Sequence, residues 1–249
     1  MGRTAAKVRR PTRSRVVERR GHSSGERQAG SLGSVISKSP NFSRTSRNSS
    51  CGVTGSDTPP LPCHVTLKVR RGLPSLRGVK FVREMERSFA AACDRGRFRV
   101  VHYSIQNDHL HAIVEATSQR DLAHGMKSIG SRLARAVNRI FGRRGSVLAD
   151  RYHLHILRTP REVRNAIAYV LLNARRHLAK LGRRLPTAAG DPASSGRRFS
   201  GWNRRFQPGS SIDPPPVAPP RTWLLRAGWR RHGLVSPTEV PGGPASSSR

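Results

Sequence analysis

Acidic residues are scarce in this chain, which has 14 Asp and Glu residues against 47 Lys and Arg residues in 249 positions and a formal net charge of +33. Such an imbalance favours a polyanionic partner, because basic side chains that neutralise phosphates release their condensed counterions. Long apolar runs are also missing, and none approaches the roughly 18 residues that a membrane-spanning helix needs. The composition therefore favours a nucleic-acid partner over a membrane.

Cysteine is rare as well, and the sequence shows no apolar leader. Cys51, Cys63 and Cys93 have spacings that match no zinc or disulfide framework, so we expect reduced thiols. The first residues are rich in Arg and Ser without the apolar block of a secretory signal; mitochondrial presequences share this bias, and the source organism would decide between the two. We expect a cytoplasmic protein, in a bacterium one associated with the nucleoid.

Three regions differ in composition. Residues 1–60 have scattered apolar residues without a sustained period, which predicts a disordered basic arm. Residues 61–180 have periodic apolar patterns and predict one folded domain. Residues 181–249 form a Pro- and Arg-rich tail with a short tryptophan-containing element near 221–234. Packing is the simpler role for these tryptophans, because buried aromatic side chains usually serve cores.

Two periodicities alternate along the predicted domain. Strict alternation of apolar and polar residues is typical of half-buried strands, whereas a spacing of three or four residues is typical of amphipathic helices. Strands are predicted over 64–70, 98–106, 109–116 and 147–157, and helices over 78–94, 121–141 and 160–177.

This order, β-α-β-β-α-β followed by a helix, predicts an α+β fold of the ferredoxin-like (RRM-like) type with an antiparallel sheet. Both long helices can cover one apolar face of that sheet. The opposite face would then be open and polar, which suits a single-stranded nucleic acid. The polar residues expected on it are His64, Thr66, Lys68, His109, His111 and His153.

Basic residues outside this face are further candidates for DNA contact. An arginine stripe on a helix is usually only a solvated face, but the net charge favours a surface for the DNA backbone. The expected DNA-binding residues are His64, Lys68, Arg132, Arg135, Arg139, Arg151, His153 and Arg176.

A histidine pair in the third predicted strand is a candidate metal site. His109 and His111 are two residues apart, so both imidazoles leave the same face of the strand and can hold one metal ion. A structural role is the simpler interpretation of an isolated His-X-His. A second pair, His153 and His155, is an alternative, although its segment contains no helical tyrosine.

The last predicted helix adds a tyrosine and an asparagine on one face. Tyr169 and Asn173 are four residues apart and lie on a shoulder of the buried stripe, beside Arg176. The carbonyl oxygen of Asn173 can serve as a third metal ligand, which suits Mg²⁺ or Mn²⁺. In the simpler interpretation Tyr169 packs at the helix edge, and Asn173 caps the helix or faces solvent.

Together these motifs resemble the REP-associated tyrosine transposases, relatives of the small insertion-sequence transposases within the HUH single-strand nucleases. His109-Leu-His111 is similar to their His-hydrophobic-His motif, and Tyr169-Val-Leu-Leu-Asn173 to their Tyr-x-x-x-Asn helix. The resemblance covers roughly residues 62–234. A proline is common after the helix asparagine in that family; Ala174 stands here, and it should leave the site intact because alanine continues a helix well.

The resemblance implies a DNA transposase with a divalent metal cofactor and a single-stranded hairpin or palindromic DNA partner. The metal, held by His109, His111 and Asn173, would polarise the scissile phosphate. Tyr169 would attack phosphorus and leave a 5′-phosphotyrosine, and Arg176 is the candidate cation that favours its phenolate. Insertion-sequence relatives work as dimers and REP-associated relatives can act alone, so a homodimer stays open.

Two other functions are compatible with the same residues. The first is a domesticated nucleic-acid-binding protein that no longer cleaves DNA. The second is a hydrolytic nuclease in which water attacks and Tyr169 is a spectator. A covalent DNA adduct would separate these from a transposase, and an adduct that does not depend on Tyr169 would indicate Tyr152 or Tyr103.

Overall fold

The computed structural model describes residues 61–93, 96–183, 190–203 and 215–242. The predicted basic arm lies outside these residues, as do parts of the predicted tail. None of the described helices is both long and apolar enough to cross a membrane.

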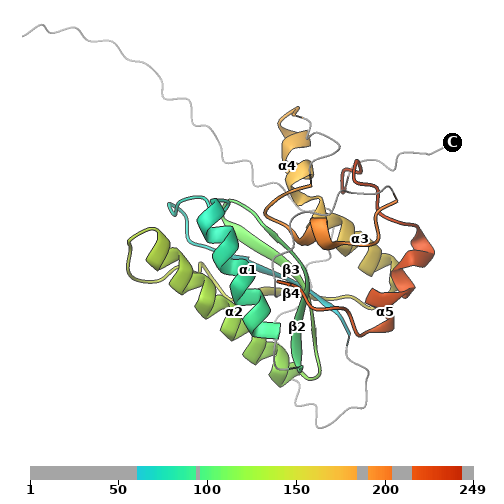
Figure 1. The fold of residues 1–249 in the computed structure, drawn as a ribbon, viewed down its shortest axis with the longest axis horizontal. Helices are drawn as coiled ribbons and strands as arrows, with labels where there is room; N and C mark the ends of the chain where they lie inside the picture. The colour runs from blue at the N-terminus through green and yellow to red at the C-terminus, as the bar shows by residue number, and fades with distance from the viewer. Residues whose placement is uncertain (1–60, 94–95, 184–189, 204–214, 243–249) are drawn as a thin grey trace, which may run out of the picture. The chain divides into compact units, whose positions relative to one another are not determined.

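The described residues build an α+β fold around one four-stranded antiparallel sheet (Figure 1). In space the strands follow the order β2-β3-β1-β4, so β3 and β1 are the central strands. The α+β class and the antiparallel sheet are therefore confirmed. The strands are β1 Cys63–Lys68, β2 Phe98–Ile105, β3 His109–Ala116 and β4 His153–Ile156.

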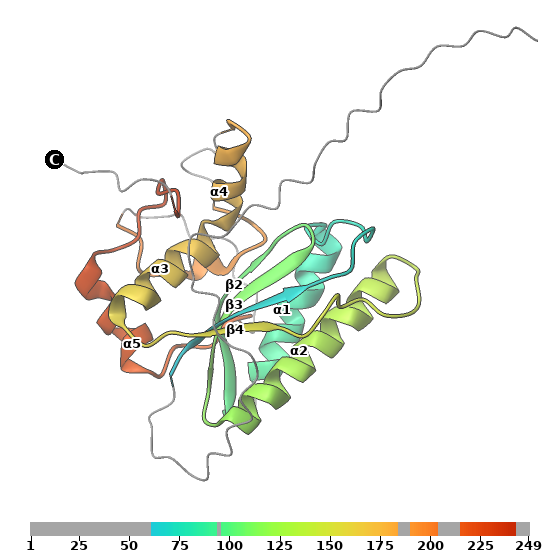
Figure 2. The same cartoon turned by 180° about the vertical axis from the view of Figure 1, so that it is seen from behind.

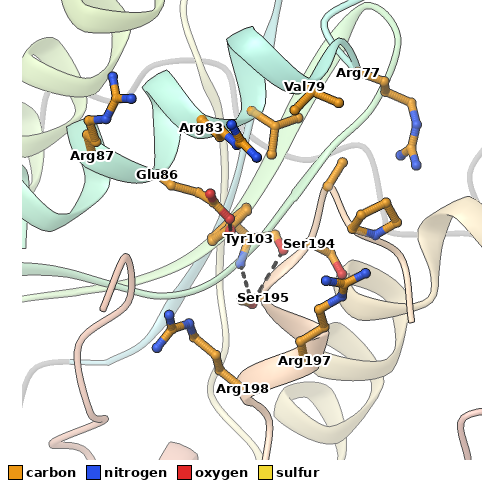
Figure 3. Close-up of a pocket in the computed structure, with 13 residues that line it drawn as sticks. Arg77, Val79, Arg83, Glu86, Arg87, Tyr103, Ser194, Ser195, Arg197 and Arg198 are labelled. Atoms are coloured by element: carbon orange, nitrogen blue, oxygen red, sulfur yellow. Dashed lines mark hydrogen bonds between the residues drawn. The ribbon is translucent and has the colours of Figure 1, made fainter. Parts of the chain in front are cut away.

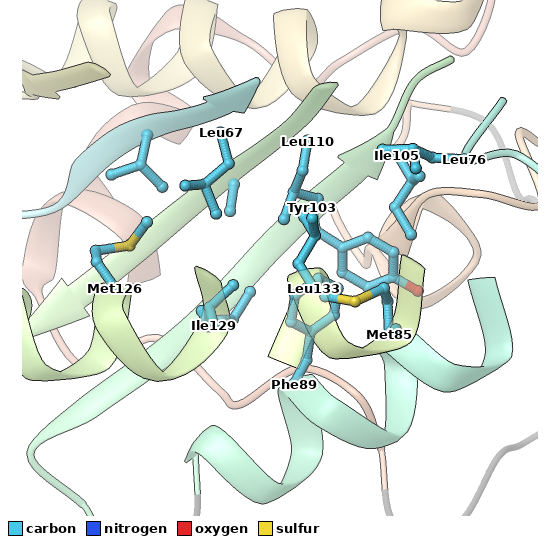
Figure 4. Packing of buried hydrophobic residues seen from close by; sticks show 14 of the residues in the cluster. Leu67, Leu76, Met85, Phe89, Tyr103, Ile105, Leu110, Met126, Ile129 and Leu133 are labelled. Carbon is cyan, nitrogen blue, oxygen red and sulfur yellow. The ribbon is translucent and has the colours of Figure 1, made fainter. Parts of the chain in front are cut away.

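One face of the sheet is covered by α1 (Val79–Cys93) and α2 (Gln119–Ile140), as predicted. Figure 4 shows side chains of both helices packed against side chains of the strands, all of them buried. The Ser118 hydroxyl caps α2 by accepting a hydrogen bond from the Asp121 backbone N–H. Burial of this apolar face drives the two-layer arrangement.

The opposite face is less open than the sequence predicted. Helix α3 (Pro160–Leu171) lies on this face (Figures 1 and 2) and forms a second buried cluster with it. Ile113, which alternation places beside His111 on the supposedly polar face, is fully buried in this cluster. The prediction of a wholly open polar face is wrong because β3 becomes apolar there and needs a cover.

The C-terminal part of the chain completes that cover. It contributes the short helices η1 (Ser195–Arg198), α5 (Trp223–Arg226) and η2 (Gly228–His232). Trp229 is 1 % exposed in the second cluster, which confirms a packing role, whereas Trp223 is 51 % exposed. Glu115 on β3 holds this part in place, because its carboxylate accepts hydrogen bonds from the backbone N–H groups of Arg221 and Thr222 and from the Thr222 hydroxyl.

The predicted tyrosine-bearing helix is two helices. Helix α3 ends at Leu171, Leu172 leaves the helical conformation with φ −107° and ψ 15°, and α4 runs over Asn173–Lys180 (Figure 2). The sequence predicted one helix to residue 177, because nothing in its propensities marks a break. Leu172, Asn173 and Ala174 are all buried, so tertiary packing overrides the helix propensity here.

The fourth strand is shorter than predicted. Only His153–Ile156 pairs along β1, and the preceding residues contribute a single isolated bridge between Val69 and Leu148. The pairing places His153 opposite Thr66 and His155 opposite His64. The start of α3 is as predicted: the Thr159 hydroxyl accepts from the Glu162 N–H while the Glu162 carboxylate accepts from the Thr159 N–H.

Candidate active site

His111 lies at the centre of a cluster of aromatic rings on the face of the sheet opposite α1 and α2. Its ring centroid is 4.7 Å from that of His109, 5.3 Å from that of His64 and 5.1 Å from that of Tyr169. Strand β3 supplies the two alternating imidazoles, β1 supplies His64, and the end of α3 supplies the phenol. The residues that the sequence singled out from three separate segments are therefore brought together.

The two ring nitrogens of His111 have different environments. Nδ1 lies 3.0 Å from Oγ1 of Thr66 and 3.2 Å from Nε2 of His64, so it is held by strand β1. Nε2 is buried and has no hydrogen-bond partner among the described residues. Burial, followed by the effect of the neighbouring His64, lowers the pKa of His111 well below its ordinary value. The imidazole is therefore neutral at pH 7, the form that binds metal ions.

Asn173 also has buried polar atoms without a partner among the described residues. It is completely buried at the start of α4, and neither Oδ1 nor Nδ2 of its amide has a partner within the described ranges. Leaving a buried polar group unpaired costs about 1–3 kcal/mol, so each such group calls for an explanation, of which a bound ion is one. An amide oxygen and an imidazole nitrogen are both donor types that divalent cations accept.

The donor set has two imidazoles and one amide. Among the described residues, no group of three or more His, Cys, Asp or Glu side chains is placed to hold a metal ion. The predicted ligand set of His109, His111 and Asn173 contains two imidazoles and one amide, and it stays a prediction. Nitrogen and neutral oxygen donors of this kind suit Mn²⁺, and the oxygen donor suits Mg²⁺.

His109 is oriented by its neighbour in the chain. Its Nδ1 lies 2.6 Å from Oδ1 of Asp108, and its side chain is 20 % exposed. Although burial acts in the opposite direction, the hydrogen bond with His109 lowers the pKa of Asp108. A carboxylate on one nitrogen fixes the ring and leaves the other nitrogen for a ligand, as around many metal-binding histidines.

Tyr169 lies between the histidines and a guanidinium group. The Cζ atom of Arg176 is 5.1 Å from the centroid of the Tyr169 ring, and the His64 ring meets that ring edge-on at 5.7 Å. The predicted proximity of Arg176 to Tyr169 is retained although the helix breaks between them. A cation over the ring face restricts the orientation of the phenol.

Three residues near the site were not identified from the sequence as parts of it. Thr66 was expected only as a polar residue of the open face, and its contact with His111 follows from the pairing register, which the sequence does not give. Asp108 precedes the predicted strand over 109–116 and was not singled out. His177 has its ring centroid 6.2 Å from that of His109. Its spacing of four residues after Asn173 was a usable signal.

The alternative nucleophiles lie elsewhere. Tyr103 is 1 % exposed, and its hydroxyl donates a hydrogen bond of 2.7 Å to Oε1 of Glu86 under α1. Burial, followed by the charge of Glu86, raises the pKa of Tyr103 far above its ordinary value. Tyr152 packs against the core on the same side of the sheet. Neither phenol lies in the ring cluster around His111.

The second histidine pair is beside the cluster. His153 is exposed and His155 is half-buried on the edge strand β4. Burial, followed by the proximity of His155, lowers the pKa of His64 to about 4. The contacts of Tyr169 are with His111 and His64, which favours the first pair as the metal site.

The predicted DNA-binding residues divide between the two sides of the sheet. Lys68, Arg151 and His153 are exposed, and Arg176 is at the ring cluster. The arginines of α2 belong to the opposite layer: Arg135 is exposed, Arg132 is half-buried, and Arg139 forms an ion pair with Glu84 of α1. Contact of all these residues with DNA stays a prediction.

A comparison with protein families agrees with the sequence motifs. Residues 63–170 match the family described as "Transposase IS200 like". A solved structure described as "Structure of the REP associates tyrosine transposase bound to a REP hairpin" is similar at 15 % sequence identity and a TM-score of 0.44; the match covers 65 % of this chain and 98 % of the other. No match was found among curated proteins.

Proposed function

Because residues 63–170 of this chain match the family of IS200-like transposases, we propose that the protein cuts and rejoins single-stranded DNA at hairpin-forming or palindromic sequences. Tyr169 is the nucleophile, and the product of the first step is a 5′-phosphotyrosine. The formal net charge of +33 supports DNA as the partner. The strand order β2-β3-β1-β4 supports a ferredoxin-like arrangement for this domain.

A single observation carries this proposal. The Tyr169 ring is 5.1 Å from the ring of His111, which has a buried nitrogen without a partner, and the buried amide of Asn173 is equally unsatisfied. A protein that only binds nucleic acid has no need for two such unsatisfied residues beside a tyrosine. Unsatisfied buried donors and acceptors are typical of functional sites instead.

The residues that would hold the metal are His109, His111 and Asn173. Bound Mg²⁺ or Mn²⁺ would act there as a Lewis acid on the scissile phosphate. Thr66 and Asp108 each occupy one nitrogen of a histidine and so direct the other nitrogen toward the ligand. Burial keeps the pKa of His111 well below its ordinary value, and a neutral imidazole is the charge state that binds a metal ion.

The covalent step needs no external energy source, because one phosphate ester bond replaces another. The Tyr169 oxygen bonds to phosphorus, the bond from phosphorus to the 3′ oxygen breaks, and the phenol gives up its proton while the departing oxygen ends as a 3′-hydroxyl. The new ester keeps the phosphoryl bond, so attack by a second 3′-hydroxyl releases Tyr169 and joins the strands. Arg176, over the phenol ring, supplies positive charge beside the reacting groups.

The test is formation of a covalent DNA adduct. A labelled single-stranded hairpin is incubated with the full chain and Mn²⁺, and the products are separated on a denaturing gel. The wild-type protein is expected to form an adduct, Tyr169→Phe to form none while it still binds the hairpin, and the control Tyr152→Phe to behave as wild type. An adduct that persists in Tyr169→Phe contradicts the proposal.

The same experiment distinguishes the other functions. Cleavage without an adduct would indicate a hydrolytic nuclease, and hairpin binding without cleavage would indicate a domesticated binding protein. That the protein acts as a homodimer stays a prediction. Its expected location, in the cytoplasm and on the nucleoid, stays a prediction as well.

A further inference from the structure

A cavity lies outside the ring cluster, at the β2 edge of the sheet. It has a volume of about 500 Å³ and lies between α1 and residues 192–198 (Figure 3). This segment runs along β2: the backbone N–H of Ile105 donates to the carbonyl of Ala193, and Ser104 forms a bridge with Ser194. Its position beside a sheet edge makes the cavity separate from the proposed cleavage site.

The walls of the cavity are fixed by buried polar contacts. Arg77 donates to both carboxylate oxygens of Asp191, at 3.1 and 2.5 Å, and to the carbonyl of Ile105 at 2.9 Å. The Tyr103 N–H donates to the Ser195 hydroxyl at 3.0 Å, and the Tyr103 hydroxyl donates to Glu86. The cavity is therefore preformed, which lowers the conformational cost of filling it.

Arginine dominates the lining. Figure 3 shows Arg83 and Glu86 on α1 facing the segment that carries Arg197 and Arg198. Asp191 compensates Arg77, and Glu84 compensates Arg87. Within the described part of the chain, Arg83 and Arg197 have no ion pair. The positive charges of at least these two residues are therefore available to an anionic ligand. The lining arginines are Arg77, Arg83, Arg87, Arg197 and Arg198.

The rest of the lining is mixed: the apolar side chains include Val79, Val82 and Ala193, and the polar ones are Glu86, Ser194 and Ser195, with the Tyr103 ring beside them. Apolar and aromatic groups next to several guanidinium groups suit a planar ring with an attached phosphate. Arginine binds phosphate oxygens in a bidentate manner and also stacks on planar rings. A volume of about 500 Å³ is in the ordinary range for a small-ligand site of roughly 300–1,000 Å³.

We propose that this cavity binds a nucleoside phosphate, supplied as one unpaired nucleotide of the DNA strand that the protein processes. The choice of DNA as the source rests on the proposed function. Ser194 is paired with Ser104, and Ser104 with His111, so the backbone of Ser194 lies two strand spacings, about 10 Å, from that of His111. The cavity lies on the α1 side of the sheet and the ring cluster on the opposite side, so a strand that enters both must pass around residues 192–198 at the β2 edge, and the cavity would fix where the strand is cut.

The test measures binding without cleavage. Full-length Tyr169→Phe protein in EDTA is titrated against two fluorescent hairpins with the same single-stranded extension, one of which has abasic residues in that extension. Loss of one bound base is expected to weaken binding about tenfold, since the contact of one base with a protein ring or guanidinium is worth about 1–3 kcal/mol. Arg83→Ala/Arg197→Ala and the cavity-filling Val79→Trp are expected to bind both hairpins equally.

The control removes two exposed arginines elsewhere, in Arg161→Ala/Arg226→Ala. It should weaken binding of both hairpins to the same extent and keep the tenfold preference. A preference that persists in both cavity variants overturns the proposal. A third outcome is that free deoxynucleoside monophosphate displaces the extension while the abasic residues have no effect on binding. This would assign the cavity to free nucleotides and overturn DNA as the source. An absent adduct in wild-type protein, with the preference intact, would refute the cleavage function and leave the cavity assignment standing.

Discussion

The Oγ1 atom of Thr66 lies 3.0 Å from Nδ1 of His111, and the two residues are directly paired across β1 and β3. This contact, shared with His64, occupies one nitrogen of the imidazole and leaves the buried Nε2 as an unsatisfied atom. A threonine on a neighbouring strand thereby determines which nitrogen of a proposed metal ligand is available. The relationship is testable, because valine has nearly the shape of threonine without its hydroxyl.

Thr66→Val is expected to raise the Mn²⁺ concentration needed for half-maximal adduct formation about 10- to 100-fold, the usual effect of removing a residue that orients a metal ligand. Thr66→Ser, which restores a hydroxyl, should recover most of the loss. The measurement is the yield of adduct over a Mn²⁺ titration. An unchanged midpoint in Thr66→Val would show that the hydroxyl does not orient His111.

Asn173→Leu should separate stability from activity. Removal of an amide that is buried without partners among the described residues is expected to raise the free energy of unfolding in EDTA by about 1–3 kcal/mol, while adduct formation is lost. Thermal unfolding of the metal-free protein measures the first effect, and the denaturing gel measures the second. A variant that is less stable and still forms the adduct would assign Asn173 to packing alone.

His102 predicts a pH dependence of stability outside the site. Burial lowers the pKa of His102 from about 6.5 to about 4, its Nδ1 has no partner among the described residues, and its ring meets Phe199 edge-on. Above pH 6.5 neither the folded nor the unfolded state is protonated. As the pH falls from 6.5 toward 4 only the unfolded state takes up this proton, so stability decreases over that window.

His102→Phe should therefore flatten the decrease. One proton fewer taken up on unfolding removes about 1.4 kcal/mol per pH unit from the slope. Urea unfolding of both proteins at a series of pH values between 7 and 4.5 gives the two slopes. Because burial also lowers the pKa values of His64 and His111, the stability of the variant should still decrease with falling pH, but less steeply. Equal slopes for the two proteins would mean that His102 titrates normally in the folded state.

Trp229 and Trp223 provide a matched pair for the C-terminal cover. Trp229→Ala is expected to lower the free energy of unfolding by about 3–5 kcal/mol, because this fully buried side chain packs in the cluster that contains α3. Trp223→Ala should cost far less, since half of that side chain is exposed. Urea unfolding measures both. Equal losses would indicate that Trp229 does not hold the cover on the sheet.

Local patterns in the sequence predicted the parts of the fold that depend on local physics. Alternation around His109 and His111 predicted the strand and the shared face, and the helical period beginning at residue 160 predicted the start of α3. Tyr169 was placed beside the histidines through the resemblance and the helical spacing, and the ring contacts agree with that prediction.

The parts that the sequence did not predict depend on contacts between distant segments. The contact between Thr66 and His111 needs the strand register, and the break at Leu172 arises from burial rather than from propensity. The cover over Ile113 includes residues more than a hundred positions away, among them Trp229. Single-residue preferences contain none of this information.

The central claim is that Tyr169 forms a covalent bond with DNA. Its most direct test is mass spectrometry of the wild-type protein after reaction with a single-stranded hairpin and Mn²⁺, followed by nuclease and protease digestion. The account predicts a nucleotide phosphate on the peptide that contains Tyr169. A nucleotide on the peptide of Tyr152 or Tyr103, or a cut strand with no modified peptide, would contradict it.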